Sequence, residues 1–269
     1  KKLDTNHFQP DGNMSHKNRM KKVFEIPSVH DYNAAFGIET LHPLVSVIDF
    51  SKAKPPSSRG DVERFSFGFY AIFLKQGQQC IMKYGRNNYD YQDGTLVFIA
   101  PGQVLTIEMT DKNYPLQGYG LLFHPDLILG TTLGRSIKEY AFFSYEVHEA
   151  LHLSEREKQI VLDCFSKIEY ELNRGIDKHS KTLIASNIEL FLNYCQRFYD
   201  RQFITRDHIN KGILKKFEEL LNGYFSSDKP QEIGLPSVAY CAQELNLSAN
   251  YFGDLIKKET GKSAQEYIQ

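Results

Sequence analysis

The C-terminal part of the chain carries the stretch LNLSANYFGDLIKKETGKSAQEYI, residues 245–268. Ser237 and Ser248 are good N-caps for two successive helices, and Asn246 between them tolerates the left-handed backbone angles of a tight turn. An ordinary helical hairpin has the same spacing, so spacing alone leaves both readings open. We predict a helix-turn-helix with helices at 238–245 and 248–260, whose apolar faces are Val238, Cys241, Ala242 and Leu245, then Phe252, Leu255 and Ile256.

The residues within this stretch closely resemble the first helix-turn-helix of AraC/XylS-family transcription regulators. In that family a serine opens the recognition helix, and an apolar pair, a KKETG exit and an S-x-x-x-Y-I start of the next helix follow. The chain has all of these, as Ser248, Leu255-Ile256, Lys257 to Gly261 and Ser263 to Ile268. The resemblance is highly specific over about the last 35 residues and weaker but concordant in order over the rest, and it implies that the C-terminal end binds DNA.

The resemblance also implies which side chains meet the DNA. Asn250, Gly253 and Asp254 would face the major groove, where asparagine can read adenine, aspartate can accept a hydrogen bond from cytosine N4, and glycine reads nothing. Three lysines would hold phosphates. The DNA-binding residues that we expect are Ser248, Asn250, Tyr251, Gly253, Asp254, Lys257, Lys258 and Lys262.

The chain departs from the family pattern in two respects. Family members carry two helix-turn-helix units, whereas this chain stops at Gln269, so we expect the second unit to be absent from it. From Arg206 onward there are 8 Lys and Arg against 9 Asp and Glu, and many members carry larger or basic residues on the recognition helix. We therefore expect weak or undetectable DNA binding by this chain alone, with an affinity that depends on the absent unit and on dimerisation.

The region 23–125 has the pattern of a β domain. Short stretches rich in aromatic and β-branched residues alternate with Gly, Pro and Asn turns, which is typical of a sandwich or barrel. Asp93 to Gln103 resembles the second half of the cupin pattern. Metal-binding cupins need histidines near this hairpin, but Cys80 to Tyr91 contains none. We expect a cupin-like β-barrel that binds a small-molecule effector and no metal or other cofactor.

The sequence after the β region has the apolar periodicity of helices. Ser154 and Glu157 form a capping box, and apolar residues then recur at helical spacing on both sides of a break at Arg174-Gly175. We predict an α+β multidomain chain with a helical hairpin that forms homodimers, although such a hairpin could equally close the β domain of a monomer. Its parts are an arm or processed end at 1–22, a sensor at 23–125, a dimerisation region at 126–200, a linker at 201–208 and a DNA-binding domain at 209–269.

An HExxH pattern occurs at His148-Glu149-Ala150-Leu151-His152. In zinc peptidases it places two imidazoles on one face of a continuous helix, with the glutamate as general base. Here the capping box at Ser154 starts a helix just after His152. His152 therefore lies near the start of a helix and not inside one. The stretch from His124 to Ser154 also resembles family members that carry sensor domains, and this resemblance implies that His148-Glu149 belongs to a connector. We expect no catalytic residue.

Composition excludes several classes of protein. The 269 residues include 32 Lys and Arg against 33 Asp and Glu, a net charge of -1, which is unlike a basic nucleic-acid wrapper. No apolar run approaches the roughly 18 residues of a membrane span, and no signal peptide is visible. The four cysteines form no CxxC pair, which favours buried thiols in the cytoplasm.

These features favour a cytoplasmic transcription regulator that binds double-stranded DNA in response to an unknown effector. Effector binding would change how the linker presents the DNA-binding units. Two alternatives stay open: a metal-independent ligand-binding or dimerisation module, and a cupin or HExxH metalloenzyme.

Overall fold

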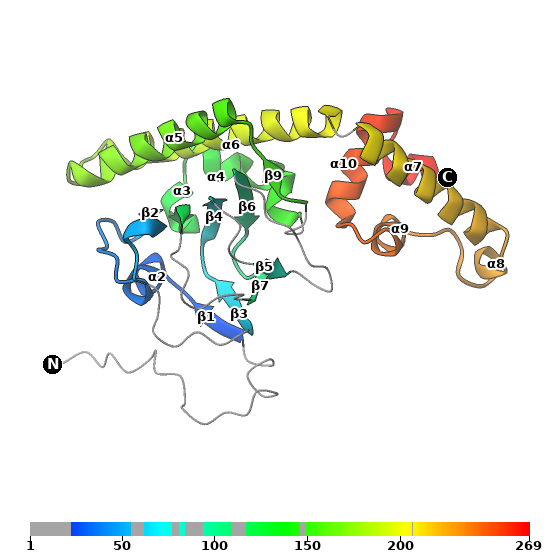
Figure 1. Cartoon of the computed structure of the whole chain (residues 1–269), viewed down its shortest axis with the longest axis horizontal. Helices are drawn as coiled ribbons and strands as arrows, with labels where there is room; N and C mark the ends of the chain where they lie inside the picture. Colours follow the sequence, from blue (N-terminus) through cyan, green and yellow to red (C-terminus); the bar gives the residue numbers. More distant parts are fainter. Residues whose placement is uncertain are drawn as a thin grey trace, which may run out of the picture.

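The computed structural model describes residues 23–54, 62–76, 81–83, 94–108, 117–145, 149–205 and 207–269. Within these ranges the N-terminal part is rich in strands, and the chain is helical from residue 155 onward (Figure 1). The predicted arm at 1–22, Cys80 and His148 lie outside the described residues. The order of elements thus agrees with a β region followed by helices.

The described strands form two sheets. Apolar and β-branched runs such as Thr95–Ile99 are buried along their whole length, as expected for strands covered on both faces. One sheet has the order β2 (Val45–Asp49), β8 (Gly118–Phe123), β4 (Tyr70–Lys75), β6 (Thr95–Ile99) and β9 (Leu151–His152), all antiparallel. The other has β1 (Val23–Ile26), β3 (Val62–Phe67), β7 (Val104–Glu108) and β5 (Ile81–Lys83), with β1 parallel to β3.

These sheets are open, and the expected closed barrel is wrong for the part of the chain that the structure describes. Successive strands from β1 to β8 alternate between the two sheets, and two of the connections are short. Between β3 and β4 the chain passes Gly68, where an added Cβ would lie 2.2 Å from the carbonyl oxygen of Pro27, so only glycine fits. Between β6 and β7 it passes Pro101 and Gly102, the latter at φ +80°. The expected hairpin there is instead a link between the sheets.

An aromatic cluster fills one side of the strand region. Tyr32 of α2 (Val29–Ala35) lies among the rings of Phe67, Phe69 and Phe73, with ring centroids 5.8, 6.1 and 6.3 Å away. Tyr70 packs instead against Phe123, at 4.9 Å between centroids. The strand register thus directs alternate aromatic residues to opposite faces of the sheet.

The predicted helical hairpin is present and covers the five-stranded sheet (Figure 1). Its helices are α5 (Glu155–Asn173), which begins with the Ser154–Glu157 capping box, and α6 (Ser180–Thr205). Gly175, at φ +85°, follows the end of α5. The two helices pack through buried apolar residues such as Phe165 and Phe191, whose ring centroids are 5.2 Å apart.

Five short helical elements lie in the connections, one between β2 and β3 and four between β8 and the hairpin. They are η2 (Phe50–Lys52), α3 (Pro125–Ile128), α4 (Thr132–Ser136), η3 (Ile137–Glu139) and η4 (Ala141–Ser144). Phe142 and Phe143 of η4 are buried against Phe98 of β6, with ring centroids 4.5 and 5.6 Å away. Helix η4 therefore packs against β6, which lies between β4 and β9 in the five-stranded sheet.

The C-terminal helices begin almost directly after α6. They are α7 (Asp207–Phe225), α8 (Lys229–Ile233), α9 (Val238–Glu244), α10 (Ala249–Thr260) and α11 (Ala264–Ile268). The expected linker at 201–208 is helical over 201–205 and again from 207, so α6 reaches further than its apolar pattern indicated. Among the helices of the described ranges, none is long and apolar enough to cross a membrane.

Candidate nucleic-acid interface

Helices α9 and α10 are joined by a tight turn over residues 245–248, where the sequence predicted a turn. The hydroxyl oxygens of Ser237 and Ser248 accept hydrogen bonds from the amides of Tyr240 and Tyr251, so each serine caps its helix. Asn246 adopts φ +56° and is the one non-glycine residue with positive φ in the described ranges. The Leu247 amide donates to the Ala242 carbonyl at 2.9 Å, which fixes the angle at which α10 leaves the turn.

A small apolar core holds α10 against α7. Phe217 of α7 and Phe252 of α10 are fully buried and meet edge to face, with centroids 4.9 Å apart. Cys241 and Ala242 of α9 are also buried, and Ala242 lets the helices approach. The predicted apolar residues Phe252, Leu255 and Ile256 all face this core, with exposures of 0%. The opposite side of α10, which carries Asn250 and Lys257, faces away from this core.

The three lysines expected to hold phosphates are exposed at the C-terminal end of α10 and just beyond it. Lys258 forms an ion pair with Asp200 of α6, and its ammonium lies 5.0 Å from the centroid of the Phe203 ring. Lys257 and Lys262 are exposed. Cations at this end also interact favourably with the helix dipole.

The side chains expected in the major groove contact the N-terminal part of the chain instead. The Asn250 amide Nδ2 donates to Ser144 Oγ at 2.7 Å, and the Tyr145 hydroxyl donates to Asp254 Oδ2 at 2.5 Å. Burial, reinforced by the neighbouring Asp254 carboxylate, raises the pKa of Tyr145, so this hydroxyl keeps its proton and remains a donor. Gly253 has open space around the position of a Cβ.

Two further expected DNA-binding residues lie at the same contact. The Ser248 amide and hydroxyl donate to Glu149 Oε1 and Oε2 at 2.7 and 2.5 Å. Tyr251 is 5% exposed and packs between the rings of Tyr145 and Phe203, with centroids 5.3 and 5.0 Å away. In this arrangement both residues face the N-terminal part.

The HExxH residues do not form the helix that a zinc peptidase needs. His152 lies in strand β9, where it pairs with Thr95 of β6. Glu149 is 2% exposed and binds Ser248, while His148 lies outside the described ranges. Where the structure describes the chain, no three His, Cys, Asp or Glu side chains gather as a metal site.

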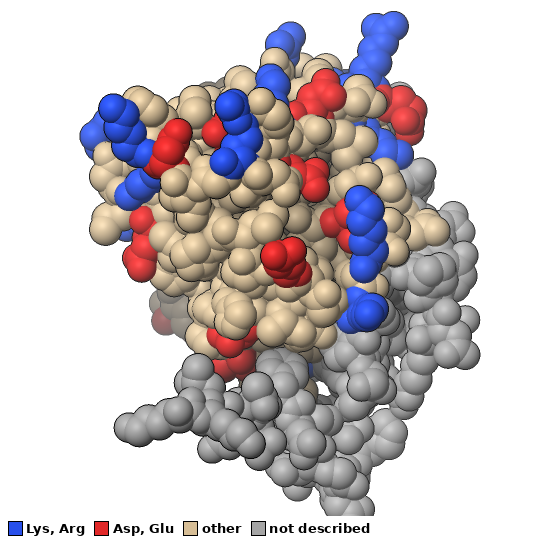
Figure 2. Space-filling view, turned by 90° about the vertical axis from the view of Figure 1, so that its left-hand side faces the viewer, with Lys and Arg blue, Asp and Glu red and all other residues tan. Residues whose placement is uncertain are grey.

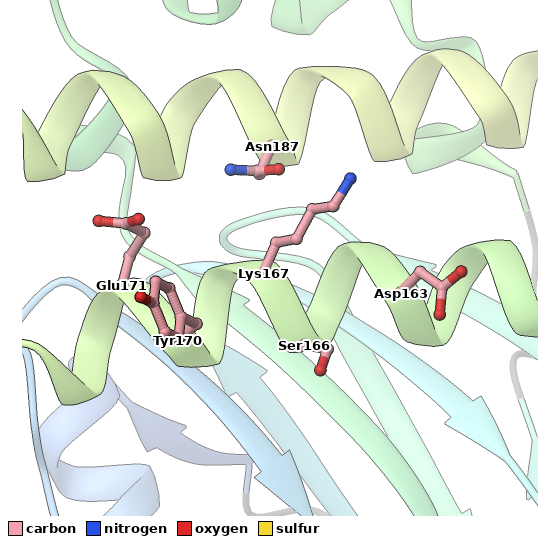
Figure 3. Close-up of a pocket in the computed structure, with 6 residues that line it drawn as sticks. All are labelled: Asp163, Ser166, Lys167, Tyr170, Glu171 and Asn187. Atoms are coloured by element: carbon pink, nitrogen blue, oxygen red, sulfur yellow. The ribbon is translucent and has the colours of Figure 1, made fainter.

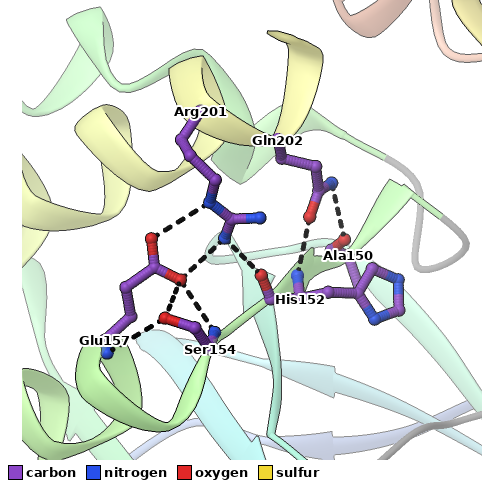
Figure 4. Close-up of polar contacts among 6 residues, drawn as sticks. All are labelled: Ala150, His152, Ser154, Glu157, Arg201 and Gln202. Carbon is purple, nitrogen blue, oxygen red and sulfur yellow. Dashed lines mark hydrogen bonds and ion pairs between the residues drawn. The ribbon is translucent and has the colours of Figure 1, made fainter. Parts of the chain in front are cut away.

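Polar contacts tie this connector to the end of α6 (Figure 4). The Gln202 amide accepts from the His152 backbone amide at 2.8 Å and donates to the Ala150 carbonyl at 3.2 Å. Arg201 donates to the His152 carbonyl at 2.6 Å and to both oxygens of Glu157. The segment at 150–152 is therefore held between β6 and α6.

Sequence reasoning missed Ser144, Tyr145 and Glu149 as partners of α10. These contacts join residues 99 to 109 positions apart, and no local pattern encodes such a pairing. The HExxH pattern did single out Glu149, but for a different chemistry. Its burial beside a helix N-terminus became visible only in the folded chain.

A shallow groove of about 590 Å³ lies along the α5–α6 hairpin (Figure 3). Lys167 and Glu171 of α5 and Asn187 of α6 contribute polar groups of both charges to it. Figure 2, which views the molecule from the left of Figure 1, likewise shows acidic and basic side chains interspersed. Neither feature has the single-sign charge of a nucleic-acid surface.

Comparisons with known proteins point to the N-terminal part. Residues 66–172 match the family model of the AraC-like ligand binding domain. A search of curated proteins finds no significant match. Among solved structures, an apo lysine-to-alanine variant of ToxT from Vibrio cholerae strain SCE256 is similar over 83% of this chain and 96% of its own, at 12% identity and a TM-score of 0.29. A TM-score this low carries no argument, so the family match alone informs the function.

Proposed function

We propose that the chain is a ligand-responsive transcription regulator. The observation that carries the proposal is the match of residues 66–172 to an AraC-like ligand binding domain, because it lies upstream of a capped helix pair with the turn of a helix-turn-helix. In this proposal residues 23–125 bind the effector, 126–200 pair two copies, and 209–269 bind double-stranded DNA in the cytoplasm. The matched domain is one that binds ligands, which favours a regulator over an enzyme.

Helix α10 would enter the major groove. Asn250 and Asp254 would read base edges, and Lys257, Lys258 and Lys262 would contact phosphates. The exposed lysines at one end of α10 and the core packing of its other side support this orientation. Ser248, Tyr251 and Gly253 complete the proposed interface.

The effector would bind beside the aromatic cluster of the sensor. Tyr32, Phe67 and Phe73 form part of a buried apolar core there. Asn33 of α2 is fully buried, and its Oδ1 has no hydrogen-bond partner among the described residues. Because a buried acceptor gains from a donor, these groups fit an apolar effector with one hydroxyl or amine.

The hairpin would pair two copies through its outer face. Leu183 and Leu190, seven residues apart on α6, are 44% and 42% exposed, and Tyr170 of α5 is 58% exposed. Residues at this spacing share one helical face, so they could meet their copies along the helix. A charge at Leu190 (L190K) should then shift the chain from dimer to monomer in light scattering.

DNA binding to a pool of random genomic fragments, measured across a salt series, tests the central proposal. Because the chain alone should bind weakly, we expect selective enrichment of fragments only at low salt, with K257A weakening binding uniformly and reducing the salt dependence by about one charge. N250A should instead change which fragments are enriched. If the wild-type chain does not bind DNA at low salt, where phosphate contacts are strongest, the DNA-binding part of the proposal is wrong.

A further inference from the structure

The segment that joins α7 to α9 exposes three large apolar side chains. Phe225 at the end of α7 is 45% exposed, Ile233 at the end of α8 is 71% exposed, and Leu235 just beyond it is 54% exposed. Phe217, two turns earlier on α7, is by contrast fully buried in the core of the C-terminal helices. Large apolar side chains that are exposed together within one short segment are typical of a surface that binds another molecule.

Hydrogen bonds hold this segment in one shape. The Tyr224 hydroxyl donates to the Gly234 carbonyl at 2.9 Å, which ties the chain beyond α8 to the end of α7. The Gly234 amide donates to the Pro230 carbonyl at 3.2 Å, and Gly234 adopts φ +79°, a conformation that favours glycine. Because the segment is already ordered, a partner that binds it loses little conformational entropy.

The free charge of this segment is negative. Asp228 and Glu232 are exposed, and neither carboxylate forms an ion pair with any residue that the structure describes. Asp228 also makes no side-chain hydrogen bond to the start of α8. The ammonium of Lys229 lies 5.7 and 5.6 Å from the ring centroids of Tyr224 and Tyr240, and it donates to the Tyr240 hydroxyl at 3.3 Å. This cation is therefore engaged within the chain, whereas the two carboxylates remain for a partner of opposite charge.

The same charges argue against the other occupants. In a two-fold contact between copies of the chain, the same surface lies on both sides, so the carboxylates of one copy would meet those of the other. Carboxylates likewise repel the phosphates of DNA. Helix α8 lies at the end of α7 that is remote from α10 and from the α5–α6 hairpin (Figure 1). Neither the proposed DNA contact of α10 nor the proposed pairing of hairpins would cover it.

We propose that residues 225–235, which we call the α8 surface, bind a different protein through a segment that combines apolar side chains with lysine or arginine. The three exposed apolar side chains supply the contact area, and the two carboxylates select a basic partner. An amphipathic basic helix has this chemistry, because its apolar side chains recur on one face. The inference goes beyond the proposed function and does not depend on DNA binding.

The test uses two synthetic amphipathic helical peptides with the same leucine face, one flanked by lysines and the other by glutamates. Each peptide is titrated into the full chain without DNA, and binding is followed through the chemical shifts of backbone amides. I233S/L235S removes apolar contacts, and D228N/E232Q removes the charge. L129S is the matched control, because Leu129 is 72% exposed in the N-terminal part. Urea titrations establish that each variant is folded.

We expect the lysine peptide to shift the amides of the α8 surface, with I233S/L235S weakening its binding about tenfold and L129S leaving it unchanged. D228N/E232Q should weaken it about threefold and abolish its advantage over the glutamate peptide. No binding of the lysine peptide, equal binding of both peptides to the wild-type chain, or unchanged affinity of I233S/L235S would each overturn the proposal. A dimer in light scattering that I233S/L235S converts to monomer would instead make a second copy the occupant.

Discussion

Helices α5 and α10 begin with the same chemistry but take it from different places. At α5 the carboxylate of Glu157 accepts from the amide and hydroxyl of Ser154, three residues earlier. At α10 the carboxylate of Glu149 makes the same two contacts with Ser248, 99 residues away. A local cap forms whenever its helix forms, whereas the cap of α10 depends on the position of another domain. The same cap geometry can therefore be encoded within one helix or depend on how two distant segments pack.

The largest expected effect concerns the apolar core that packs α10 against α7, independently of the contacts between α10 and the N-terminal part. F252A removes a fully buried ring that contacts Phe217, so we expect the C-terminal helices to lose about 3–5 kcal/mol of unfolding free energy in urea titrations. F225A, at a ring that is 45% exposed on α7, should cost far less. A loss below about 1 kcal/mol for F252A would mean that docking, and not its own core, maintains α10.

The second effect tests the distant cap. E149A removes a buried acceptor of two hydrogen bonds, and we expect a loss of about 1–3 kcal/mol in the unfolding of the C-terminal helices. The readout is their urea transition, followed by amide exchange. The exposed Glu139 provides a control in E139A, which should have no measurable effect. Equal effects of the two variants would remove the distinction between the caps.

The local cap of α5 should give a smaller effect in the other part of the chain. E157A removes the capping-box carboxylate and its ion pair with the half-exposed Arg201. We expect a loss of about 1–2 kcal/mol that appears in the first turn of α5 and leaves α10 protected. E155A, also in the first turn but outside the box, is the control. Loss of protection at α10 would show that the two caps are coupled.

The smallest effect is a pH dependence at α11. The Ser263 hydroxyl and amide hydrogen-bond Glu266 and lower its pKa. A lowered carboxyl pKa contributes stability above the unfolded value of about 4.3, and this contribution is lost as pH falls through the folded value. E266Q should therefore flatten the acid limb of the stability curve below about pH 5. An unchanged acid limb would contradict this expectation.

The helices and the N-terminal sheets also differ in how much of their structure could be predicted from local sequence patterns. The predicted serine caps at 154, 237 and 248 are confirmed, as are the hairpin and the positive φ of Asn246. Each is encoded within a few residues. The closed barrel was wrong, because strand pairing is set between distant segments and successive strands from β1 to β8 alternate between two open sheets.

The same distinction between local and long-range information applies to the candidate site. The sequence by itself determined that a capped helix pair with exposed lysines stands at the C-terminus, since helical periodicity, capping and turn propensity act over one or two turns. Only the tertiary structure decided that Asn250 and Asp254 face Ser144 and Tyr145, and that Glu149 caps α10. Hydrogen bonds between segments about a hundred residues apart depend on how whole elements pack, and packing is a property of the folded chain rather than of any local stretch.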